Sequence, residues 1–263
     1  MPASQALSSR FNSSLLSRVE DAGLNASAPP QQRWVDGWLV RFSAGKAKRA
    51  RCVNAVADGR LTISARLALC QAVFAQAELP MVVRITPFTR PSDLDQTLAA
   101  MGLRSIDDTR VMVLATLNEL AQATLPAGLS VHAIGLESFA QRVGALRESP
   151  LSQRQAHAER LLHSPVPFSA FELRSRGEVL ACGQYAIEAN LVGLYDVFTA
   201  PAARGRGCAR LLCQHMLGHA HERGAQHAYL QVEGDNHPAR AVYHRLGFAD
   251  AYAYHYRTTA VEA

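Results

Sequence analysis

The chain has 263 residues, a formal net charge of +5, 48% hydrophobic residues and five cysteines without a Cys-x-x-Cys pair. Its length predicts two domains with ample buried core, and its odd cysteine count argues against a disulfide framework and for a reducing cytosol. Because we find no apolar run suited to a signal peptide or membrane span, and the charge is too mild to indicate nucleic acid, we expect a cytoplasmic protein with neither a membrane nor a nucleic-acid partner.

The N-terminal half begins with a serine-rich stretch, and we expect residues 1–22 to form a flexible segment. The densest basic run, 46–51, is interpreted as a solvated strand or loop, with a polyanion-binding patch as the alternative. The patterns of apolar, aromatic and turn residues predict a strand over 33–42 with a tight turn at Asp36-Gly37, a helix over 65–77, a strand over 81–86, a helix over 92–101 that ends at Gly102, and a strand over 109–117.

Two segments of the chain share one order of elements. Residues 98–103 and 111–113 give a helix, a glycine stop, a hydrophobic residue and a strand, and residues 243–248 and 252–254 give the same order. This repeat predicts that the N-terminal half is a degenerate copy of the C-terminal half.

The boundary between the two halves is predicted within 118–128, a segment in which Pro126 and Gly128 interrupt the periodic runs. We therefore expect an N-terminal domain over 23–120 and a C-terminal domain over 127–263. The apolar spacing in the second domain predicts a strand at 129–134, helices at 136–147 and 152–162, a hairpin of 168–174 with 179–187, and a strand at 191–199.

The most informative stretch follows that last strand and joins it to the next helix through Arg204, Gly205, Arg206 and Gly207. A loop that feeds a helix N-terminus binds anions, because unpaired backbone N–H groups and the helix dipole both point at the ligand. The glycines allow the backbone to approach closely, and the arginines add forked donors suited to phosphate. We therefore predict that this loop binds a diphosphate.

Two common diphosphate motifs do not fit this loop. A nucleoside-triphosphatase P-loop ends in Gly-Lys-Ser/Thr, whereas this chain has Gly207-Cys208-Ala209. A dinucleotide fingerprint needs a small residue where Arg210 stands, because the helix packs closely on its strand at that point. Both alternatives are therefore set aside.

Downstream of the loop the predicted order is helix, strand, helix and strand, over 207–223, 227–232, 236–246 and 252–257. Arg204-x-x-Gly207-x-Ala209 resembles the acetyl-CoA pyrophosphate loop of the GCN5-related N-acetyltransferase (GNAT) superfamily. Residues 230–248 resemble the second motif of that superfamily, in the expected order. Its matching positions here are Leu230, Val232, Asn236, Ala239, Tyr243, Gly247 and Phe248.

The ends of the chain extend the resemblance. The strands containing Asp36-Gly37-Trp38-Leu39 and Tyr254-His255-Tyr256-Arg257 are similar to those that begin and end a group of bacterial acetyltransferases. The resemblance implies the GNAT fold, an α/β (α+β mixed sheet) architecture in which two central strands splay apart to admit the pantetheine arm. We therefore expect a tandem form, with a C-terminal catalytic unit beside a degenerate N-terminal GNAT-like unit.

The activity that this resemblance implies is direct transfer of the acetyl group of acetyl-CoA to a primary amine. Acetyl-CoA is then the cosubstrate and no metal is needed. The acceptor is expected to be the amine of a small molecule or of a protein, and a homodimer stays an open alternative.

The resemblance also assigns roles to individual residues. Tyr243 takes the position of the general acid, and Asp196 is the favoured general base. Glu233 and ordered water are the alternative bases, because Gln231 stands where some members carry glutamate. The structural alternatives are that Asn236 serves only as a helix cap and that Tyr243 is only a core aromatic residue. The acetyl-CoA contacts are expected from Val197, Phe198, Thr199, Arg204, Gly205, Arg206, Gly207, Cys208, Ala209 and Asn236.

Three further features have plainer interpretations. Cys208 is expected to fill space rather than to act as a nucleophile. His215 and His219 share a helix face but lack the glutamate of a zinc-protease helix, so we expect packing and no metal site. Gln231 leaves a second function open, that of an acetyl-CoA-binding or sensing protein whose catalysis has lapsed.

Overall fold

The computed structural model describes residues 6–43, 47–118 and 124–259. Lys46 and part of the predicted domain boundary lie outside these ranges. The N-terminal half contains α1 (Ser13–Ala26), β1 (Gln32–Val35), β2 (Trp38–Arg41), η1 (Lys48–Ala50), β3 (Val53–Asn54), α2 (Ile63–Gln76), β4 (Val82–Ile85), α3 (Leu94–Ala100) and β5 (Arg104–Leu114).

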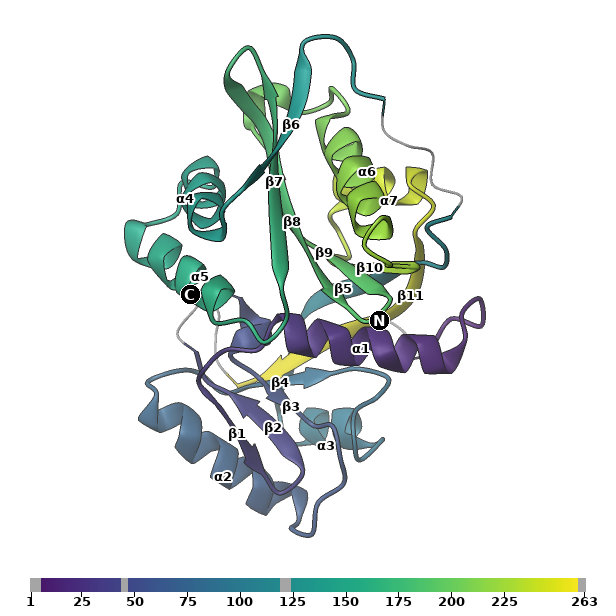
Figure 1. Cartoon of the computed structure of the whole chain (residues 1–263). Helices are drawn as coiled ribbons and strands as arrows, with labels where there is room; N and C mark the ends of the chain where they lie inside the picture. Colours follow the sequence, from purple (N-terminus) through teal and green to yellow (C-terminus); the bar gives the residue numbers. More distant parts are fainter. Residues whose placement is uncertain (1–5, 44–46, 119–123, 260–263) are drawn as a thin grey trace.

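The C-terminal half follows the predicted order of elements. It contains β6 (Leu129–Ile134), α4 (Leu136–Leu146), α5 (Leu151–Leu162), β7 (Phe168–Ser175), β8 (Glu178–Glu188), β9 (Leu191–Thr199), η2 (Pro201–Ala203), α6 (Cys208–His221), β10 (His227–Glu233), α7 (His237–Arg245) and β11 (Ala249–Thr258). In the described residues, the eleven strands form one mixed sheet in the order β1-β2-β3-β4-β11-β5-β10-β9-β8-β7-β6 (Figure 1).

The two halves exchange their last strands. β5, from the N-terminal half, lies between β10 and β11, with Val111 opposite both Gln231 and Tyr252. β11, from the C-terminal half, lies between β4 and β5, with Tyr256 opposite Arg84 on β4. Each half therefore completes the sheet of the other.

This exchange follows the same pattern on both sides of the β5–β11 pair. The parallel pair β3–β4 is followed by the borrowed strand β11 and then by the half's own strand β5. The parallel pair β9–β10 is likewise followed by the borrowed strand β5 and then by β11. The mixed α/β sheet and the tandem arrangement of two related units are thus as the sequence predicts, although the units are not separable blocks.

Helix α1 corrects, for residues 13–22, the expectation that residues 1–22 form a flexible segment; residues 1–5 lie outside the described ranges. Asn12 caps this helix by accepting a hydrogen bond from the N–H of Ser14 over 2.7 Å. Leu16 and Val19 are almost fully buried in a core cluster that includes strand residues of both halves. The cap and the helical spacing of these apolar residues are the sequence signals for the helix, and burial between the two halves stabilises it.

Helices cover both faces of the C-terminal part of the sheet (Figure 1). On one face α6 packs on β8 and β9 through Leu212 and Met216. On the other face α4 packs on β7 and β8 through Phe139 and Val143. These buried apolar side chains anchor the strands that carry the site, since each contributes on the order of 2 kcal/mol by leaving water.

The two central parallel strands separate partway along their length. β9 and β10 pair from Leu191–His227 as far as Leu194–Leu230, and beyond that point no pairing joins them. On its other edge β9 stays paired to β8, with Phe198 opposite Cys182 and Thr199 opposite Ala181. The edge of β9 that faces the separation therefore leaves backbone groups available to a ligand.

Candidate active site

The predicted anion loop lies between η2 and α6. Gly205 has φ +74° and Gly207 has φ +76°, the left-handed region that glycine adopts at little cost. Nothing lies within 4 Å of the position that a Cβ would take at either glycine. The backbone conformation, rather than crowding by neighbours, therefore selects glycine at both positions.

The first turn of α6 leaves its backbone donors free of side-chain caps. Gly207 is the N-cap residue, and its side-chain hydrogen cannot accept the helix N–H groups. The first intrahelical bond runs from the N–H of Leu211 to the carbonyl of Gly207, which leaves the earlier N–H groups for a ligand. Arg204 and Arg206 are exposed beside this turn. The loop thus offers backbone donors and two cations on one surface.

Cys208 points into the protein rather than toward the loop surface. Its side chain is 3% exposed and belongs to the cluster under α6. This burial supports its interpretation as a small space-filling residue. Ala209 is half-buried in the same turn.

The separated end of β9 carries a bulge. The register shifts between Cys182–Phe198 and Gln184–Tyr195, and Asp196 adopts φ +50° within that irregularity. Such a bulge redirects neighbouring side chains. Phe198 follows two residues after Asp196. The guanidinium carbons of Arg147 and Arg204 lie 5.4 and 5.7 Å from the centroid of its ring.

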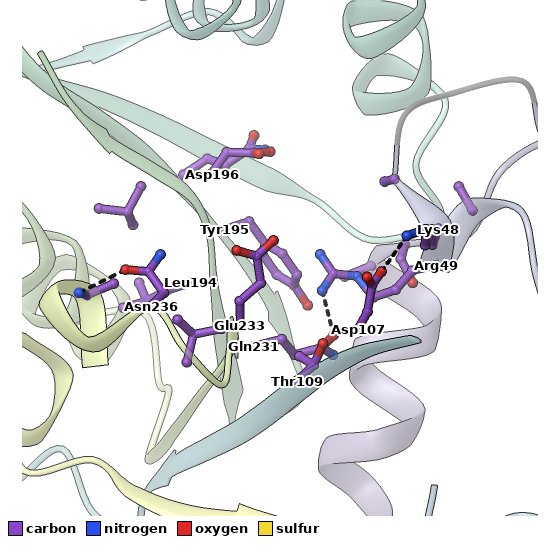
Figure 2. Close-up of a pocket in the computed structure, with 18 of the residues that line it drawn as sticks. Lys48, Arg49, Asp107, Thr109, Leu194, Tyr195, Asp196, Gln231, Glu233 and Asn236 are labelled. Carbon is purple, nitrogen blue, oxygen red and sulfur yellow. Dashed lines mark hydrogen bonds and ion pairs between the residues drawn. The ribbon is translucent and has the colours of Figure 1, made fainter. Parts of the chain in front are cut away.

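A cavity of about 560 Å³ opens at this separation. Val197, Asn236 and Tyr243 line it from the C-terminal half, and Lys48 and Arg49 line it from the N-terminal half. Figure 2 shows Asn236 on one side of this cavity and Lys48 and Arg49 on the other. The structure therefore brings part of the predicted coenzyme strand together with the predicted acid. Its N-terminal wall is supplied by the degenerate unit.

Tyr243 lies on α7 with its ring packed edge-on to Phe248 at a centroid distance of 6.1 Å. Among the described residues no hydrogen-bond partner of its hydroxyl is found, although the residue lines the cavity. Burial raises the pKa of this phenol, so it holds its proton at neutral pH. That is the state required of a proton donor.

Asn236 caps α7. Its Oδ1 accepts a hydrogen bond from the N–H of Ala239 over 3.2 Å, so the helix-cap role is confirmed. The residue also lines the cavity, and its contact with acetyl-CoA stays a prediction.

Asp196 is surrounded by polar side chains from the C-terminal end of α4, from α5 and from β8. Arg147 Nη1 and Gln184 Nε2 each donate to the carboxylate over 2.9 Å, and His157 Nε2 lies 3.3 Å from it. Burial alone raises the pKa of this carboxyl, but His157 and Arg147 outweigh burial and hold the pKa well below its usual range. A carboxylate held this low is a weak proton acceptor, which weighs against Asp196 as the general base.

Gln231 is fixed as a hydrogen-bond acceptor. Its Oε1 receives Arg49 Nη1 over 2.7 Å and the Tyr254 hydroxyl over 2.9 Å. Glu233, two residues along β10, is exposed and lines the cavity (Figure 2). In the described part of the chain the Glu233 carboxylate has no basic partner. Of the two carboxylates predicted as candidate general bases, Asp196 and Glu233, Glu233 is therefore the more available to accept a proton.

Arg49 is a site residue that the sequence did not reveal. It lies in the basic run interpreted as a solvated strand or loop, whereas the structure places Lys48 and Arg49 on η1 against the cavity. Lys48 pairs with Asp107 over 2.6 Å. No local spacing links this run to β10, because the two meet only through the tertiary fold.

A second cavity of about 850 Å³ lies between α4, α5 and the N-terminal half. Both cavities are lined by the same five residues, Ala47, Ala50, Arg147, Arg160 and Asp196. The two cavities therefore meet at the charged cluster around Asp196.

The histidines on α6 pack against aromatic side chains. His215 and His219 lie 5.5 and 5.0 Å from the Phe171 ring, and His219 Nδ1 is 2.6 Å from the Tyr185 hydroxyl. Within the described ranges there is no cluster of three or more His, Cys, Asp or Glu side chains suited to a metal. Nor does any described helix combine the length and apolar character needed to cross a membrane.

Known proteins resemble this chain at several levels. Residues 136–248 match the model of the acetyltransferase (GNAT) family. The uncharacterized N-acetyltransferase YobR of Bacillus subtilis is 23% identical over 235 residues, which cover 86% of this chain and 91% of that protein.

Two solved structures share the fold at low identity. A GCN5-related N-acetyltransferase from Kribbella flavida aligns with a TM-score of 0.63 and 16% identity, over 93% of this chain and 96% of that one. A tandem GNAT protein from the clavulanic acid biosynthesis pathway aligns with a TM-score of 0.60 and 16% identity, over 76% of this chain and 70% of that one.

Proposed function

We propose that this chain, whose residues 136–248 match the acetyltransferase (GNAT) family, transfers the acetyl group of acetyl-CoA to a primary amine by direct attack. The observation that carries the proposal is the separation of β9 from β10 after Leu194 and Leu230, close to a glycine loop at the start of α6. Together these features offer a slot for an extended thioester arm and an anion site for its diphosphate.

Coenzyme binding is assigned to backbone groups more than to side chains. The N–H groups at the start of α6 and the guanidinium groups of Arg204 and Arg206 would bind the diphosphate. The free edge of β9 over Val197, Phe198 and Thr199 would bind the pantetheine arm and polarise the thioester carbonyl.

The chemical step then needs one base and one acid. The neutral amine attacks the thioester carbon, and the tetrahedral intermediate expels CoA thiolate as the new amide bond forms. Tyr243 donates its proton to the thiolate, while Glu233 or a water molecule removes the proton from the amine. The ion pairs of Asp196 favour a role in holding Arg147 and His157 at the cavity junction rather than a role as base.

A second function, an acetyl-CoA sensor with lapsed catalysis, is favoured by one observation. Gln231 cannot accept a proton at neutral pH, and Arg49 and Tyr254 bind its carbonyl oxygen. The two functions are separated by measuring CoA release with a panel of amines beside acetyl-CoA binding by calorimetry. Binding with turnover supports the enzyme, binding without turnover supports the sensor, and no binding at low salt contradicts both.

We place this reaction in the cytoplasm of a bacterium, with an amine of a small molecule or protein as acceptor. No metal, membrane or nucleic acid has a part in it. The homodimer stays a hypothesis, which sedimentation of the purified chain tests.

A further inference from the structure

We propose that the acceptor is a small amine that also carries an acidic group, and that Arg160 binds that group where the two cavities meet. The inference rests on the proposed acetyltransferase activity and narrows its substrate class. It is drawn from the charges that line the cavities and from which of them already have partners.

Arg160 is a half-buried arginine without a partner. It lies on α5, lines both cavities, and makes no hydrogen bond or ion pair with any residue in the described ranges. Two other arginines that line the second cavity do have partners. Arg147 pairs with Asp196, and Arg154 Nε donates a hydrogen bond to the carbonyl of Ser149 over 2.7 Å. A guanidinium has five N–H donors and keeps its charge, so a shielded guanidinium without partners is suited to a carboxylate or phosphate.

The two aspartates that line the first cavity form their ion pairs with residues other than Arg160. Asp107 pairs with Lys48, and Asp196 pairs with Arg147. Burial lowers the pKa of Arg160, Asp196 raises it, and the positive charge of Arg49 lowers it again. An anionic group bound here would relieve both the desolvation of Arg160 and its repulsion by Arg49.

The same cavity contains a carboxylate for the amine end of such a molecule. Glu233 lines the cavity with Tyr243 and has no basic partner within the described ranges. An acceptor with an ammonium and an acidic group therefore meets an unpaired anion and an unpaired cation in one cavity. The volumes of about 560 and 850 Å³ lie in the usual range for small-molecule sites, which favours a small acceptor over a folded protein.

The test compares matched acceptors that differ only in the acidic group. CoA release is measured with each standard amino acid beside its carboxamide, and with O-phosphoethanolamine beside ethanolamine. The wild type should favour the acidic member of at least one pair. Arg160→Gln should lower kcat/KM for that member by about 10- to 100-fold, the loss expected for hydrogen bonds to a charged group, and should leave its neutral partner and the KM for acetyl-CoA unchanged.

Arg176→Gln is the matched control, because Arg176 is exposed on the hairpin turn between β7 and β8 and lines neither cavity. A preference for amino acids over their carboxamides would show that Arg160 binds a carboxylate, and a preference for O-phosphoethanolamine over ethanolamine would show that it binds a phosphate. Equal turnover of acidic and neutral members, or an equal loss for both in Arg160→Gln, would overturn the inference while the acetyltransferase activity stands.

If no amine is acetylated, the activity fails and the anion site is judged by thermal unfolding. N-acetylated amino acids and their amides are then the probes. Stabilisation by the acids alone, lost in Arg160→Gln and kept in Arg176→Gln, would support the site. Equal responses to acids and amides, or no response to either, would overturn it.

Discussion

Arg49 donates a hydrogen bond to the side chain of Gln231 over 2.7 Å, which joins η1 of the N-terminal half to β10, the strand that bounds the proposed coenzyme slot. Helix α1 closes the other side, since a Cβ at Gly23 would lie 2.8 Å from Gln231 Nε2. The degenerate half therefore takes a direct part in the site, because it determines the surroundings of the residue at the family's glutamate position.

Gln231→Glu tests whether this position supplies a missing base. The new carboxylate would lie beside the Arg49 guanidinium, which lowers its pKa and keeps it ionised at neutral pH. We expect kcat to stay within about threefold of wild type and the pH profile of kcat/KM to gain no limb near neutrality. Gln231→Leu, which removes the acceptor, should lower stability instead. A tenfold gain in kcat for Gln231→Glu would favour lapsed catalysis.

Tyr243→Phe removes one hydroxyl and retains the ring that packs on Phe248. We expect kcat to fall by about tenfold to a thousandfold, near the lower part of the range for general acids, with little change in KM for acetyl-CoA. Tyr185→Phe is the matched control, since Tyr185 is buried and its hydroxyl contacts His219 away from the cavities. It should affect thermal stability but not kcat. An unchanged kcat in Tyr243→Phe, with chemistry shown to limit the rate, would leave Tyr243 as a core aromatic.

Gly207→Val should abolish acetyl-CoA binding, because the left-handed backbone at φ +76° disfavours a β-branched residue and the loop must change shape to accept it. Gly177→Val is the matched control, with φ +86° and open space in the β7–β8 turn. Both variants should lose about 1–2 kcal/mol or more of stability from backbone strain. Calorimetry should show binding only in the control, and binding retained by Gly207→Val would contradict the assigned loop.

Asp196→Asn should reduce stability in a pH-dependent manner. The folded-state pKa of this carboxyl lies below its ordinary value of about 3.9, so its stabilisation is present above that pH and lost as pH falls through the folded pKa. Urea unfolding should therefore show the full deficit of the variant near neutral pH and a shrinking deficit in acid. Asp250→Asn should cost less, because the Asp250 carboxylate that pairs with Arg240 is more exposed than that of Asp196 and loses one ion pair only.

The same Asp196→Asn variant separates the two candidate bases. Because Asp196 is ionised throughout the neutral range, its replacement should not move the low-pH limb of kcat/KM. A displaced limb would restore Asp196 as the base. Glu233→Gln should lower kcat/KM for the amine if Glu233 removes the amine proton.

The strand exchange makes a prediction for the separated halves. Residues 124–263 alone lack β5, which leaves β10 without a partner on one edge, and residues 1–118 alone lack β11. Each piece should therefore be poorly folded when produced alone, and the two produced together should assemble and bind acetyl-CoA. Circular dichroism and calorimetry measure both outcomes. A well-folded, acetyl-CoA-binding piece of residues 124–263 would show that β5 is dispensable.

The sequence was most informative where function depends on local backbone geometry. Gly205 and Gly207, the helix that follows them, and the capping residue Asn236 were found because glycine, proline and cap signals act over a few residues. The faint repeat also predicted the tandem architecture. These features need no knowledge of which strands pair.

Strand pairing and side-chain contacts between residues far apart in the sequence could not be predicted from these local signals. The alternation of apolar residues in β5 predicts a strand but not its neighbours β10 and β11. Asp196 lies on β9, as the sequence predicts, and lines the cavity. Its ion pair with Arg147 and its contact with His157, however, depend on α4 and α5 packing over the sheet. The contact of Arg49 with Gln231 arises in the same way.

The exchange of β5 and β11 also has a consequence for synthesis on the ribosome. The gap between β4 and β5 is filled by residues 249–258, which are made more than 130 residues after β5. Until they emerge, the earlier half has exposed strand edges that are able to pair with other chains. Completion of both halves is thereby delayed until β11 is made, so products that terminate before β11 should be prone to aggregation and degradation.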